Sequence, residues 1–103
     1  GNILKVEALI QSKQNNIKDI EDDIKKLRSD QLLVDRLSDE QEKDEQRSNL
    51  DDQIKEKIDM GKEELNSIKE LEEKIKVMQE GLKEFIMEKT QEIRSIQKNA
   101  FVQ

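Results

Sequence analysis

Two pairs of adjacent aspartates, Asp22–Asp23 and Asp51–Asp52, are the residues whose type could support general acid–base chemistry. Catalytic carboxylates need a pocket that shifts their pKa values, and an extended helical chain offers none. The chain contains no His and no Cys, which excludes a His-based triad and a zinc site built on those ligands. We therefore expect solvated surface charges, no enzyme activity, no catalytic residue, no metal site and no cofactor.

A row of lysines in the second half of the chain is the other candidate for binding chemistry. It repeats every seven residues and comprises Lys55, Lys62, Lys69, Lys76 and Lys83. The net charge of −6 and the aromatic content of 2% argue against a nucleic-acid role. A membrane-surface helix would be net basic and richer in aromatic residues. We interpret the row as the charged flank of a coiled coil, with a lipid- or filament-binding rod as an alternative function.

The elements that carry these residues must be helices, because the composition is typical of a long helix and not of a compact domain. Of 103 residues, 43% are charged and only 32% are hydrophobic, too little apolar material for a globular core. No run of 18 apolar residues could cross a membrane. We expect an all-α, long-helix coiled coil without a globular core, as a segment of a larger intracellular protein. Its location would be cytoplasmic or cytoskeletal, with the nucleus also open.

Apolar residues follow the seven-residue period of coiled coils in two blocks, residues 1–37 and residues 50–103. Residues 38–49 between them contain no apolar residue, and are either a turn or a polar stretch of one helix. Ser48 or Asn49, followed by acidic residues, predicts a helix start there. The predicted self-association core consists of Ile10, Ile17, Ile24, Leu27, Val34, Ile54, Ile58, Leu65, Ile68, Ile75, Leu82, Ile86, Ile93 and Ile96.

A third apolar row, formed by Leu71, Met78 and Phe85, lies beside that core in the second block. The apolar face of this block is therefore wider than a two-stranded coiled coil requires. The extra width predicts a surface that could take a helix from a partner protein.

The charges that flank the core favour antiparallel pairing, because the first block is mostly acidic where the second carries lysine. Folding the chain near residue 45 brings Glu7 to Lys83 and Glu21 to Lys69, and a register one heptad away fits nearly as well. Two antiparallel forms follow. One is a hairpin with its turn in residues 38–49 and an exposed overhang at residues 87–102. The other is a continuous helix that crosses its twin.

The leading functional hypothesis is a structural oligomerisation and scaffold segment that sets the spacing and orientation of attached domains. Its partner would be a second copy, in a homodimer or a higher assembly, or another helical protein. The first alternative is capture of a partner helix on the row Leu71, Met78 and Phe85.

The heptad pattern resembles the coiled-coil segments of motor tails, spindle and centrosome scaffolds, and chromosome-organising ATPase arms. That resemblance covers the whole chain, rests on the heptads alone and assigns no functional residue.

Overall fold

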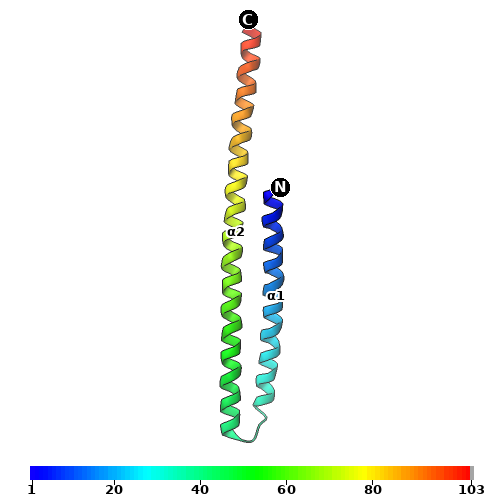
Figure 1. The fold of residues 1–103 in the computed structure, drawn as a ribbon, viewed down its shortest axis with the longest axis vertical. Coiled ribbons are helices and arrows are strands. Elements are labelled where there is room, and N and C mark those ends of the chain that lie inside the picture. The colour runs from blue at the N-terminus through cyan, green and yellow to red at the C-terminus, as the bar shows by residue number, and fades with distance from the viewer. Residues whose placement is uncertain (103) are drawn as a thin grey trace.

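The computed structural model describes the backbone of residues 1–102 and the side chains of residues 1–100. Two helices, α1 (Asn2–Val34) and α2 (Glu40–Val102), pack antiparallel as a hairpin (Figure 1). The resulting rod measures 96 × 14 × 14 Å. The all-α class and the antiparallel pairing are thereby confirmed, and the hairpin is the form that the chain adopts.

Helix α1 ends without a glycine or a proline. The backbone N–H of Asp35 still donates to the carbonyl of Gln31, but Arg36 and Leu37 donate to the carbonyls three residues before them, of Leu33 and Val34. This change from α-type to tighter bonding satisfies the last carbonyls of the helix and turns the chain away from its axis.

Helix α2 begins at a side-chain cap. The Oδ1 of Asp39 accepts hydrogen bonds from the backbone N–H groups of Gln41 at 3.0 Å and Glu42 at 3.3 Å. An aspartate three residues before a glutamate is the composition of a capping box. Glu40 and Glu42 also place negative charge at the positive end of the helix dipole. Asp39 therefore defines the start of α2.

The connection between the helices is residues 35–39, shorter and earlier than the range 38–49 that we expected. Residues 40–49 are the first turns of α2, and Ser48 and Asn49 lie inside the helix instead of at its start. Arg47 contacts Asp35, the first residue after α1, so residues 40–46 lie beyond the end of α1. Because α1 does not lie alongside these residues, they need no apolar face for helix packing, and a polar sequence can remain helical there.

The core is a thin line of side chains along the contact between the helices. The buried residues are Val6, Ile20 and Val34 from α1 and Ile54 and Ile68 from α2. A seam of two helices covers only one side of each, so most other apolar side chains are half-buried or exposed.

Helix α2, with 63 residues, continues far beyond the start of α1, which has 33 (Figure 1). Every side chain of residues 79–100 is exposed, and we refer to these residues as the C-terminal overhang. The overhang begins earlier than residue 87, because the chain folds back nearer residue 40 than residue 45. The side chains of Phe101 and Val102, which we also expected in the overhang, lie outside the described residues.

Candidate interaction surface

Polar contacts between the helices define their register. Lys13 Nζ lies 3.7 Å from Glu64 Oε2, and Lys57 Nζ lies 3.2 Å from Asp23 Oδ2. The midpoint of each pair along the sequence lies near residue 40, so the chain folds back there and not near residue 45. Lys83 lies in the overhang beyond the N-terminal end of α1, so it does not meet Glu7 as we expected.

The residues predicted as a self-association core fall into three environments. In the seam between the helices, Val34, Ile54 and Ile68 are buried, and Ile10, Ile17, Ile24, Leu27 and Ile75 are half-buried. Ile58 and Leu65 stand at the outer edge of the seam, 37% and 50% exposed. The remaining four, Leu82, Ile86, Ile93 and Ile96, lie on the overhang. Much of the predicted core therefore serves contact within one chain.

The third apolar row, and not the row of Ile58 and Leu65, completes the seam. Leu71 and Met78 are half-buried, and only Phe85, on the overhang, is exposed. The polar members of this row are Lys57 and Glu64, and both find oppositely charged partners on α1. The alternative row would have placed Glu72 against apolar side chains of α1. Helix α1 therefore occupies part of the face that we expected a separate partner helix to take.

The lysine row Lys55, Lys62, Lys69, Lys76 and Lys83 is exposed along α2. The ion pairs recorded between the helices use Lys13, Lys57 and Arg47 instead.

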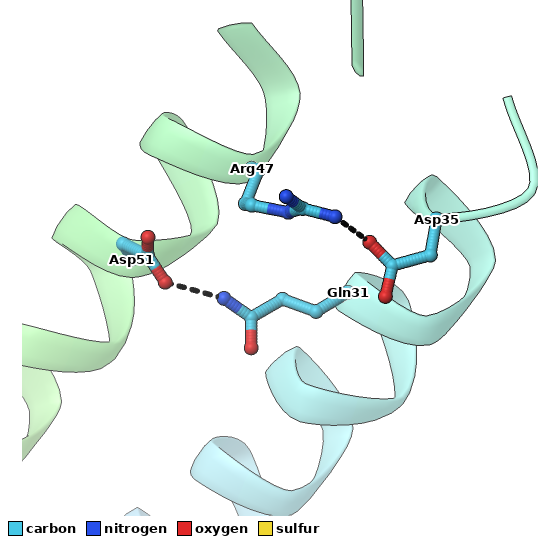
Figure 2. A network of polar contacts seen from close by, with 4 residues as sticks. All are labelled: Gln31, Asp35, Arg47 and Asp51. Atoms are coloured by element: carbon cyan, nitrogen blue, oxygen red, sulfur yellow. Dashed lines mark hydrogen bonds and ion pairs between the residues drawn. The ribbon is translucent and has the colours of Figure 1, made fainter. Parts of the chain in front are cut away.

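A cluster of four polar residues joins the helices next to the connection (Figure 2). Arg47 of α2 donates to the carboxylate of Asp35, and Gln31 Nε2 of α1 donates to Asp51 Oδ1 at 2.6 Å. The hydrogen bond from Arg47 holds the pKa of Asp35 below its ordinary value of 3.8, with a smaller opposing effect of desolvation. The same contact raises the pKa of Arg47.

Sequence reasoning missed this cluster, although a signal was present. Gln31, in the last turn of α1, and Asp35, which caps its C-terminal end, are four residues apart, and Arg47 and Asp51 are four residues apart on α2. Residues at this spacing share one face of a helix, so each helix presents two matching polar groups to the other.

Each of the two aspartate pairs takes part in the contact between the helices. Asp23 pairs with Lys57 and Asp51 accepts from Gln31, so each pair supplies one carboxylate to the contact between helices. Within the part of the chain that the structure describes, no group of three or more His, Cys, Asp or Glu residues could hold a metal ion. Neither described helix has an apolar stretch of the length needed to cross a membrane.

The overhang carries the clearest unpartnered surface. Six large apolar side chains in it are each more than half exposed: Leu82, Phe85, Ile86, Met87, Ile93 and Ile96. Four of them, Leu82, Ile86, Ile93 and Ile96, follow heptad spacing and share one face of α2. We refer to these four as the overhang stripe. Lys89 occupies the position on the same face between Ile86 and Ile93.

The overhang stripe is an apolar surface of the size and pattern that another helix could cover.

No protein-family model matches the chain, and comparisons with curated proteins and with solved structures found no significant match.

Proposed function

We propose that this chain is a structural coiled-coil segment that self-associates and sets the spacing of the segments attached to it. The observation that carries the proposal is the overhang, a continuation of α2 whose apolar stripe α1 does not cover. Most helical stability in proteins comes from packing of an apolar face. A helix that leaves such a face in water gains stability when a second helix covers it.

The shape of the hairpin suits a spacer. A helix rises about 1.5 Å per residue, and α2 passes the start of α1 by the length of the overhang (Figure 1). Segments joined at the two ends of this chain would therefore sit at different heights along the rod, roughly 35 Å apart by that rise. Self-association would then fix the distance between such segments on different copies.

Sedimentation equilibrium of the 103-residue chain tests the proposal. We expect a dimer or a higher assembly at micromolar concentration, with the circular dichroism spectrum of a nearly complete helix. A chain that stays monomeric at every concentration tested would contradict self-association.

Capture of a helix from another protein is the second candidate, and the exposure of Phe85 favours it. Phe85 is 55% exposed, and Lys89 Nζ lies 5.6 Å from the centroid of its ring. Because α1 covers Leu71 and Met78, only the Phe85 end of that row remains open to a partner. Phe85→Asp should then abolish partner capture while self-association survives. Loss of both together would favour the scaffold.

A further inference from the structure

We infer that the C-terminal overhangs of two copies of this chain pair antiparallel about a twofold axis near residue 91, with the hairpins pointing in opposite directions. This inference rests on the proposed self-association and names its surface and its geometry. Three features of the overhang support the inference: its continuity with the α1–α2 seam, the spacing of the overhang stripe and the charges at the centre of the overhang.

The overhang continues one row of the surface that α2 already uses to pack against α1. Leu82, in the overhang stripe, lies one heptad after Ile75, which is half-buried against α1. The other row of the stripe, Ile86 and Ile93, continues the row of Ile58 and Leu65 at the outer edge of the seam. Helix α2 runs on past the N-terminal end of α1 (Figure 1). A helix of a second copy that packed antiparallel on the overhang would therefore extend the Ile75 row beyond α1.

The spacing of the stripe allows it to pair with itself. Leu82, Ile86, Lys89, Ile93 and Ile96, with Ala100 after them, alternate four-residue and three-residue steps. Reversal about residue 91 superposes these positions on one another. Ile86 then packs on Ile96 of the second copy, and Leu82 packs on its Ala100. Each layer combines the two types of core position, as antiparallel coiled coils require.

The position of Lys89 at the centre of the stripe favours the antiparallel arrangement. Lys89 Nζ lies 3.3 Å from Glu92 Oε2 of its own chain. Reversal about residue 91 brings Lys89 level with Ile93 of the second copy and next to its Glu92, so the two lysines lie at different heights along the axis. A parallel pair in register would instead place Lys89 directly on Lys89.

The distribution of charge on the two sides of the axis also favours antiparallel pairing. Residues 79–90 carry three acidic and two basic side chains, and residues 91–100 carry one acidic and two basic side chains. Antiparallel pairing places the more acidic half of one copy beside the more basic half of the other. This complementarity favours a second copy of the chain as the occupant of the overhang.

Distances between spin labels on the full chain test the geometry. The sequence contains no Cys, so Gln91→Cys and Gln46→Cys each provide one labelling site, near the axis and near the tip of the hairpin. We expect a short distance between copies at residue 91. The tips should lie on the order of 130 Å apart, because the helix rises about 1.5 Å per residue.

Each other result overturns the inference. Short distances at both sites would show hairpins packed side by side in parallel. Long distances at both sites, in a sample that sedimentation shows to be a dimer, would place the interface elsewhere and leave the proposed self-association intact. A monomer would contradict both proposals.

A pair of matched substitutions tests the surface. Ile93→Asp places a charge in the centre of the inferred interface, and Leu65→Asp places one on a half-exposed position of the hairpin. We expect Ile93→Asp to raise the dimer dissociation constant roughly 100-fold, and Leu65→Asp to change it only a few-fold, with both chains still helical. The opposite pattern would assign self-association to the hairpin and overturn the inference.

The central charges provide a test of their own. Lys89→Glu makes the axis acidic in both copies, and Glu92→Lys makes it basic, so each variant should dimerise more weakly than the original chain. A mixture of the two should form heterodimers, because opposite charges then face each other in both contacts. A mixture that associates no better than its components would contradict the inferred juxtaposition.

Discussion

Gly61 of α2 lies against Ile20 of α1, across the seam between the two helices. A methyl group added at Gly61 would lie 3.8 Å from Cγ2 of Ile20, an ordinary packing distance. The backbone of Gly61 is helical, with no positive φ that would require glycine.

The first prediction follows from this contact. Gly61→Ala should stabilise the hairpin by about 1 kcal/mol, because alanine loses less backbone entropy in a helix and gains contact with Ile20. Urea unfolding followed by circular dichroism measures the change. Gly81→Ala is the matched control, since nothing lies within 4 Å of the added methyl group and Gly81 lies in the overhang. A loss of stability in Gly61→Ala would mean that the helices cannot accommodate the methyl group.

The second prediction concerns the start of α2. Asp39→Ala removes the acceptor of two backbone N–H groups and should cost about 1 kcal/mol of unfolding free energy. Asp39→Ser should retain most of the stability, because serine also caps helices. Ser48 is the helix start expected from the sequence, but it lies inside α2. Ser48→Ala should therefore leave stability unchanged or raise it slightly. A larger effect at Ser48 than at Asp39 would contradict the observed start.

The third prediction concerns pH and the contact between Asp35 and Arg47. The pKa of Asp35 is lower in the folded hairpin than in the unfolded chain. The contact therefore stabilises the fold above the unfolded-state pKa, and this stabilisation is lost as the pH falls through the lowered value. Asp35→Asn should lower the unfolding midpoint at pH 7, and the difference from the original chain should vanish in strong acid.

Asp52→Asn is the control for this experiment, since Asp52 makes no hydrogen bond or ion pair recorded among the described side chains. It should change the unfolding midpoint little at either pH. A deficit of Asp35→Asn that persists undiminished in strong acid would show that the effect does not come from the carboxylate.

The fourth prediction concerns the polar pair inside the seam. Lys13 and Glu64 are each about a quarter exposed, and Glu64 Oε2 has no hydrogen-bond partner. Lys13→Leu combined with Glu64→Leu should raise the unfolding free energy by about 2 kcal/mol, through burial of apolar surface. Lys13→Leu alone should destabilise the hairpin, because it leaves the carboxylate of Glu64 unpaired. A double-mutant cycle measures both effects.

The fifth prediction tests which face of α2 meets α1. Ile68 is 6% exposed and Ile58 is 37% exposed, so the same truncation should have different costs. We expect Ile68→Ala to lower the unfolding free energy by about 3 kcal/mol and Ile58→Ala by about 1 kcal/mol. Equal costs would indicate that α1 also covers the outer edge of the seam.

The sequence by itself determined the helical class, the absence of a globular core and the antiparallel orientation. These properties follow from composition and from the period of the apolar residues, which are local and repeat many times along the chain. A single polar residue at an apolar heptad position, such as Lys13 between Val6 and Ile20, does not obscure them. The charges of Glu21 and the lysine row pointed to the correct orientation, although these residues are not the partners that the structure brings together.

Only the tertiary structure decided the position of the turn, the register and the row of α2 that packs against α1. A heptad pattern looks the same after a shift of seven residues, so it defines register only up to such shifts. The difference is made by single pairs, Lys13 with Glu64 and Lys57 with Asp23, and by the cap at Asp39. Each contributes little free energy by itself, and they act together only once the two helices lie side by side. The same register leaves the overhang stripe uncovered, and that surface is where a second copy of the chain would bind.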